Sequence, residues 1–77
     1  MQPEQAMNTK ELIACINAFL QTQKKENRMI FVRRYWYMND IKSIALIYGF
    51  TESKVKMSLQ RMRIRLMMYL KEEGFNV

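Results

Sequence analysis

A chain of 77 residues with 13 Lys+Arg, 7 Asp+Glu and no His carries a formal net charge of +6. This length supports one small domain with a modest core, so a large buried active site is not expected. The positive charge favours a polyanionic partner or an anionic surface, although many solvated helix faces are also basic. Residues 51–71 hold six basic residues and one acidic residue, whereas residues 1–50 hold seven and four, so the excess lies towards the C-terminus.

The N-terminal segment, residues 1–8, is polar and contains Pro3, and we expect it to be frayed or disordered. The folded domain is expected over residues 9–74, and its first helix over about residues 9–22. Asn8 and Glu11 have the spacing of a capping box, with Thr9 as a competing cap. The stripe expected to be buried on this helix comprises Leu12, Ile13, Ile16, Phe19 and Leu20.

Cys15, the single cysteine, lies within the first predicted helix. We expect it to be a small buried hydrophobe rather than a redox centre or a nucleophile. One cysteine forms no disulfide within the chain, which fits a reducing, cytoplasmic environment. The sequence has no secretory signal pattern and no apolar run as long as a membrane span.

The second helix is expected over about residues 25–37. Its β-branched and aromatic residues also suit a strand, but no second strand is available for pairing, and an isolated strand is not stable. We therefore predict a helix, with Phe31, Tyr35 and Trp36 in the core.

Residues 40–65 carry the clearest pattern in the chain. Asn39 or Asp40 can cap a third helix, and Gly49 ends it where a left-handed backbone needs no Cβ. The apolar face expected on this helix comprises Ile41, Ile44, Ala45, Ile47 and Tyr48. Phe50 is expected to fill the corner that follows.

A last helix, expected over residues 52–73, begins after a Thr51 cap. Its apolar positions recur at i+3 and i+4: Val55, Leu59, Met62, Leu66 and Leu70. Two helices joined by a tight turn, the second of them basic, form the helix-turn-helix pattern, in which the second helix enters the major groove of DNA. The predicted fold is thus all-α: a small four-helix domain with a helix-turn-helix and no wing.

Three successive segments share the motif of a known family. The first contributes Phe31, Arg34, Tyr35 and Trp36, and the second Ile44, Ala45 and Gly49. The third contributes Thr51, Glu52, Val55, Lys56, Leu59, Arg61, Arg63 and Leu66. With these residues, positions 9–74 resemble region 4 of a bacterial RNA polymerase sigma factor of the extracytoplasmic-function type.

The resemblance implies a promoter-recognition module that binds the −35 element of double-stranded promoter DNA through helix 52–73. It also implies docking on the β flap of RNA polymerase and, as a further partner, an anti-sigma factor. Region 2 of a sigma factor is not among these residues, so we expect either a domain of a longer protein or a stand-alone relative. The alternative is a stand-alone dimeric helix-turn-helix regulator that pairs through Ile64, Met67, Met68 and Tyr69.

The last helix can also be examined as a wheel at 100° per residue. With Val55 pointing inward, Ser53, Met57, Gln60 and Ile64 point outward. Lys56 and Arg63 flank one side of this outer face; Lys54, Arg61 and Arg65 flank the other. Such an arrangement suits base contacts from the outer face and phosphate contacts from the flanks.

Individual roles follow from side-chain chemistry. Gln60 can pair with adenine and Met57 can contact a thymine methyl, although both are also ordinary surface residues. Lys42 lies on the helix that crosses the DNA backbone in this geometry, and simple solvent exposure explains it equally well. The predicted DNA-binding residues are Arg34, Lys42, Ser53, Lys54, Lys56, Met57, Gln60, Arg61 and Arg63.

Catalysis finds little support in the sequence. There is no His, no Gly-rich phosphate loop and no cluster with metal-ligand spacing, and Cys15 has no base to activate it. We expect no enzyme activity, no cofactor and no metal. Binding of the basic, amphipathic last helix to a membrane surface is a further alternative, but its apolar face is needed to cover the other helices.

Overall fold

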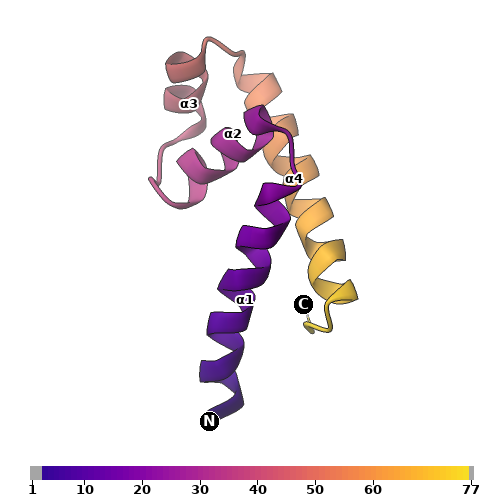
Figure 1. The fold of residues 1–77 in the computed structure, drawn as a ribbon. Helices are drawn as coiled ribbons and strands as arrows, with labels where there is room; N and C mark the ends of the chain where they lie inside the picture. Colours follow the sequence, from indigo (N-terminus) through magenta and orange to yellow (C-terminus); the bar gives the residue numbers. More distant parts are fainter. Residues whose placement is uncertain (1–2, 77) are drawn as a thin grey trace.

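The computed structural model describes the backbone of residues 3–76 and the side chains of residues 9–76. Over residues 3–76 the chain forms helices and turns and no strand, as expected for an all-α protein. The helices are α1 (Pro3–Gln21), α2 (Lys25–Tyr35), α3 (Ile41–Tyr48) and α4 (Glu52–Glu72), shown in Figure 1.

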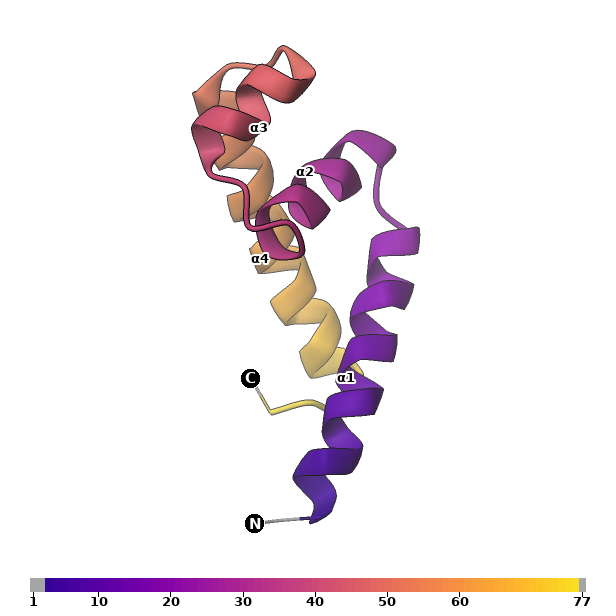
Figure 2. The same cartoon turned by 90° about the vertical axis from the view of Figure 1, so that its left-hand side faces the viewer.

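α4 is the longest helix and packs against each of the other three. α2 crosses it, α3 packs on α2 and on α4, and α1 lies beside the C-terminal half of α4 (Figures 1 and 2). The molecule is therefore elongated, measuring 43 × 21 × 18 Å. α3 and the start of α4 form one end, and α1 extends towards the other.

The predicted caps of α3 and α4, and the glycine between the two helices, are confirmed. The Asp40 carboxylate accepts a hydrogen bond of 2.7 Å from the Ser43 backbone N–H, so Asp40 rather than Asn39 caps α3. Gly49 ends α3 with a φ of 71°, and Thr51 Oγ1 accepts from the Lys54 N–H at 3.0 Å to start α4. Only the three residues 49–51 separate the two helices.

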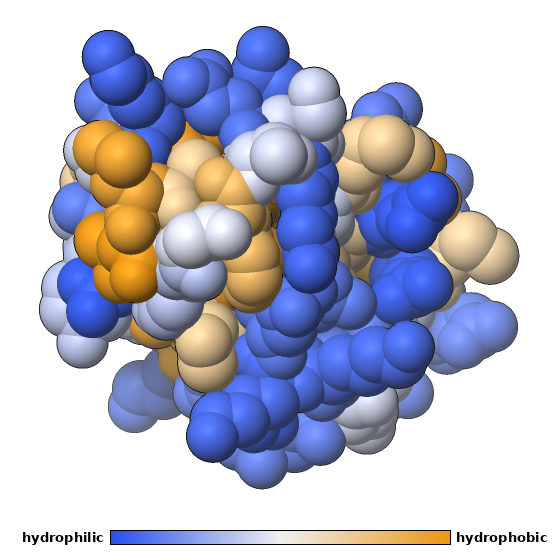
Figure 3. Space-filling model, turned by 90° about the horizontal axis from the view of Figure 1, so that it is seen from above, coloured by the Kyte–Doolittle hydropathy of each residue, from blue (hydrophilic) through white to orange (hydrophobic). Residues whose placement is uncertain are grey.

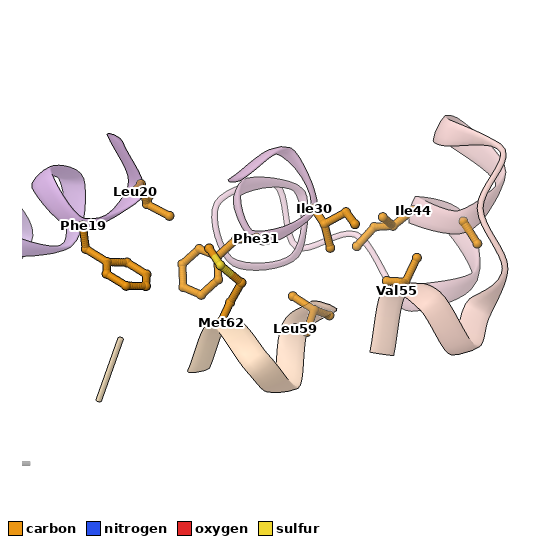
Figure 4. Close-up of a cluster of buried hydrophobic side chains, with 9 residues drawn as sticks. Phe19, Leu20, Ile30, Phe31, Ile44, Val55, Leu59 and Met62 are labelled. Carbon is orange, nitrogen blue, oxygen red and sulfur yellow. The ribbon is translucent and has the colours of Figure 1, made fainter. Parts of the chain in front are cut away.

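The core lies where α2 and α3 cross α4, with the end of α1 closing one side (Figure 4). Val55, Leu59 and Met62 of α4 are fully buried, as the apolar spacing predicts. Phe50 packs against this core from the corner, also as expected. The other buried members are Phe19, Leu20, Ile30, Phe31, Ile44 and Ala45.

The predicted start of the first helix at residue 9 is wrong, because α1 begins at Pro3. Fraying of residues 1–8 stays a prediction. Proline fits the first turn of a helix, and the Glu, Gln, Ala and Met that follow are good helix formers. Residues 1 and 2 lie outside the described part. The limits of an independent folding unit, placed at residues 9–74, stay a prediction.

α2 is shorter than expected, ending at Tyr35 rather than at residue 37. The backbone turns away at Met38, which has a positive φ of 58°. The prediction that Tyr35 and Trp36 belong to the core is wrong, since they are 39% and 52% exposed. Their rings lie tilted against the ring of Phe31, at centroid distances of 4.7 and 6.3 Å.

Ile13 and Ile47 are exposed, although both were expected on buried faces. α1 meets mainly α4, so only a narrow stripe of α1 is covered, and Leu12 and Cys15 are half-buried at its margin. α3 is short and contacts α2 and α4 on one side only. In both helices the apolar stripe of the sequence is wider than the surface that the neighbours cover.

Candidate nucleic-acid interface

An exposed strip runs along the N-terminal half of α4 and comprises Ser53, Met57 and Gln60. It lies opposite the buried side chains of Val55 and Leu59, so the predicted rotation of the helix is confirmed. The strip belongs to the end of the molecule where α3 and the start of α4 meet. Seen from above this end, much of the surface is hydrophilic, with a hydrophobic area to one side (Figure 3).

On one side of the strip, Lys54 is held in place by two contacts. Its Nζ lies 3.1 Å from Oε2 of Glu26 and 4.2 Å from the ring centroid of Phe50. Both partners are partly exposed, so the ion pair orients Lys54 more than it stabilises the fold. Arg61, about two turns further along the same side, is exposed.

The other side of the strip holds Lys56 and Arg63, which differ in their surroundings. Lys56 is exposed next to Met57. Arg63 Nη1 donates a hydrogen bond of 2.9 Å to the hydroxyl of Tyr35, so its guanidinium is directed towards α2. The two flanking cations that the wheel treats alike are therefore placed differently.

The remaining predicted contacts lie on other helices. Arg34 Nη1 donates to the backbone carbonyl of Asn39 at 3.1 Å, which ties the end of α2 to the connection before α3. Lys42 is exposed in the first turn of α3. The structure thus gathers Ser53, Lys54, Lys56, Met57, Gln60 and Arg61 on one half of α4, and places Arg34 and Lys42 outside that helix.

A polar contact that the sequence analysis missed joins α2 to α4 beneath this surface. Ser58, only 9% exposed, donates from Oγ to Oδ1 of Asn27 at 2.9 Å. A buried hydroxyl without an acceptor is costly, so the pair sets the contact between the two helices. In the sequence, Ser58 can be recognised as a small polar residue at the edge of the apolar stripe of the last helix. This pattern does not show that Asn27 is its partner.

An apolar hollow of about 390 Å³ opens where α1, the end of α2 and α4 meet. Its walls include Ile16, Phe31, Trp36 and Leu66, with Tyr35 and Arg63 at the same site. The exposed aromatic rings at the C-terminal end of α2 therefore border a concavity rather than a flat surface. It shares Arg63 and Leu66 with a second, smaller apolar hollow, which extends along α4 to Met67 and Leu70.

Comparisons with models of protein families, with curated protein sequences and with solved structures find no match for this chain. Within the described residues, no helix has both the length and the apolar character needed to span a membrane. Over the same part of the chain, no three His, Cys, Asp or Glu residues are grouped so that they can hold a metal ion.

Proposed function

We propose that this chain is a promoter-recognition module of the sigma region 4 kind, in which α3, the turn and α4 act as a helix-turn-helix. The observation that carries the proposal is the outer strip of α4. Its side chains are exposed beside several cations, while the opposite face of the same half-helix is fully buried. A helix anchored in this way presents one fixed face to a groove of DNA.

In the proposed complex, Ser53, Met57 and Gln60 face base edges of the −35 element. An amide reads adenine through two hydrogen bonds, and an apolar side chain contacts a thymine methyl. Lys56 and Arg61 flank the strip and bind phosphates of the two strands. Arg34 and Lys42 are assigned further backbone contacts from α2 and α3.

The same proposal assigns the apolar hollow to RNA polymerase. Exposed apolar concavities mark sites of protein–protein contact, and Trp36 is the kind of aromatic residue that anchors such contacts. We assign the β flap to this hollow, and an anti-sigma factor would compete for it and for the strip on α4. The module would act in the cytoplasm as a binding protein and not as an enzyme.

The second candidate is a stand-alone dimeric regulator. It draws on the exposed side chains of Ile64, Met67 and Met68, which follow the strip along α4. Methionine adapts readily to a partner surface. A dimer of this kind would bind a palindromic site, whereas a sigma module reads an asymmetric element as a monomer.

Transcription in vitro tests the proposal. The full chain is joined to the remaining regions of a sigma factor in place of that factor's own region 4, and run-off transcripts are measured from two promoters. We expect transcription from a promoter that requires its upstream element, and its loss when that element is scrambled. A promoter that does not need the element serves as the control.

Sedimentation of the isolated chain with DNA separates the two candidates. We expect a monomer that binds DNA weakly, because one small module makes few base contacts. Tight binding of a dimer to a palindrome would overturn the sigma proposal in favour of the regulator.

A further inference from the structure

A separate, polar hollow of about 270 Å³ lies between the start of α2 and the side of α4. Four cationic side chains line it: Lys24, Lys54, Arg61 and Arg65. Among the described residues that line it, Glu26 is the single carboxylate. This arrangement differs from a basic helix face, because Lys24 comes from the N-cap of α2 and the other cations from α4, and together they line a concavity.

The acidic group in this hollow already has a partner. Glu26 is paired with Lys54 at 3.1 Å, so their charges largely cancel. Ser58 donates a hydrogen bond to Asn27, so these two uncharged polar side chains of the lining are paired with each other. The charge left over belongs to Lys24, Arg61 and Arg65.

Arg65 makes a long contact of 3.4 Å to the Gln23 side chain, and Lys24, Arg61 and Arg65 are all exposed. Converging cations in a concave site focus a positive potential, and guanidinium and ammonium groups match the oxygens of a phosphate. The first turn of α2 borders the same hollow, and Lys24 at its N-cap makes no side-chain cap hydrogen bond. The partial positive charge of a helix start adds to this potential.

Met57 lines the hollow as well as the outer strip, so the two sites adjoin. We propose that the hollow is a phosphate seat that binds the backbone of the DNA strand next to the bases facing Met57. This inference rests on the proposed function and extends it to Lys24, a residue outside the helix-turn-helix. It also gives Glu26 a role, because this carboxylate holds Lys54 away from the phosphate.

The salt dependence of DNA binding tests whether the hollow binds a phosphate of the DNA backbone. Lys24→Gln and Arg65→Gln should each reduce the slope of log K against log[salt] by about one unit, with no change in the preferred sequence. Glu26→Gln should tighten binding, because it frees Lys54. Lys10→Gln and Lys71→Gln remove the same charge from exposed positions outside the hollow and should leave the slope unchanged.

A second measurement, without DNA, separates this inference from the proposed function. Pyrophosphate is titrated into the isotope-labelled chain, and amide chemical shifts are recorded. We expect saturable shifts at residues 24–27 and at Arg61 and Arg65, which disappear in Lys24→Gln and persist in Lys10→Gln. If these shifts occur but the chain binds no DNA, the hollow binds phosphate, whereas the proposed function and the assignment of the hollow to the DNA backbone both fail.

Two outcomes overturn the inference. Local pyrophosphate binding together with an unchanged DNA salt slope in Lys24→Gln would mean that the hollow takes a free phosphate compound and not the DNA backbone. Equal effects of the hollow variants and the control variants in both measurements would show that only the overall charge matters.

Discussion

Arg63 in the middle of α4 donates a hydrogen bond of 2.9 Å to the hydroxyl of Tyr35, the last residue of α2. This contact directs a cation of the basic helix towards the apolar hollow, whose lining includes both residues. Arg63 therefore lies between the two surfaces of the proposed function, the DNA-reading strip and the docking hollow. A guanidinium held by a phenol is less available to a phosphate than a free one.

The first prediction compares Arg63 with Arg61. In the proposed DNA complex, Arg61→Ala should lower the salt slope by about one unit, because it removes one phosphate contact. Arg63→Ala should lower it less, because its guanidinium is engaged by Tyr35. In a Tyr35→Phe background, which removes the acceptor, the effect of Arg63→Ala on the slope should grow. Equal effects in both backgrounds would show that the hydrogen bond does not restrain Arg63.

The second prediction concerns the core. Leu59 is fully buried beneath the α2–α4 contact, so Leu59→Asp should unfold the domain. An unpaired buried carboxylate costs several kcal/mol, and a domain of this size has about 5 kcal/mol or less in reserve. Ile64→Asp places the same charge on the exposed face of the same helix and should keep the helical circular dichroism of the parent. A Leu59→Asp protein that melts like the parent would contradict the inward assignment.

The sequence predicts the α3–α4 half of the molecule better than the α1–α2 half, for a physical reason. Caps and a left-handed glycine are local signals, and they place Asp40, Gly49 and Thr51 correctly. Exposure depends on which helices lie opposite, and this depends on contacts between distant residues. The periodicity thus identifies the apolar side of α1 but not how much of it α4 covers, and Ile13 stays exposed.

The same limit applies to the candidate site. The wheel gives the rotation of α4, since Val55 and Gln60 lie on opposite sides of a single helix. It does not show that Glu26 reaches Lys54, or that Tyr35 accepts from Arg63, because these contacts depend on the angle at which α2 crosses α4. Lys56 and Arg63 are equivalent on a wheel, but in the structure Arg63 is hydrogen-bonded to Tyr35, whereas Lys56 is exposed next to Met57.

The third prediction tests the turn between α3 and α4. Gly49 has a φ of 71°, and a Cβ built at this position meets nothing within 4 Å. Gly49→Ala should therefore destabilise the domain by about 1–2 kcal/mol through the left-handed backbone alone. Gly49→Asn should cost less, since asparagine tolerates this conformation better. Thermal melts of both variants check the order, and an alanine variant as stable as the parent would contradict it.

The fourth prediction concerns acid stability. Hydrogen bonds from the backbone N–H and the side chain of Ser43 hold the pKa of Asp40 below its ordinary value of 3.8. Desolvation raises this pKa by less, and the positive charges of Arg34 and Lys42 make the smallest contributions, which lower it. Because the folded pKa is the lower one, the charged cap stabilises the fold above the ordinary pKa. That stabilisation is lost as the pH falls through the folded pKa.

Asp40→Asn keeps an N-cap acceptor but does not titrate. The difference in free energy of unfolding between parent and variant should therefore be constant near neutral pH and should change in favour of the variant below the ordinary pKa of Asp40. Denaturant titrations of both proteins at a series of pH values measure this. A difference that does not vary with pH would show that the Asp40 charge has no part in capping α3.

The last prediction separates base contacts from phosphate contacts. Met57 and Gln60 point away from the core and lie between the flanking cations. In the proposed complex, Gln60→Ala and Met57→Ala should change the preferred upstream sequence, at about 1–3 kcal/mol for each base contact that the substitution removes. Arg61→Ala should instead weaken binding to all sequences alike.

Binding of each variant to a promoter library at two salt concentrations distinguishes these effects. Ile64→Ala, on the same outer face but further along α4, is the matched control for removing an exposed apolar side chain. If the Gln60 and Met57 variants keep the parental preference while Arg61→Ala shifts it, α4 sits in the groove with a different rotation. Arg61 would then contact the bases, and residues on the opposite side of the strip would contact the phosphates.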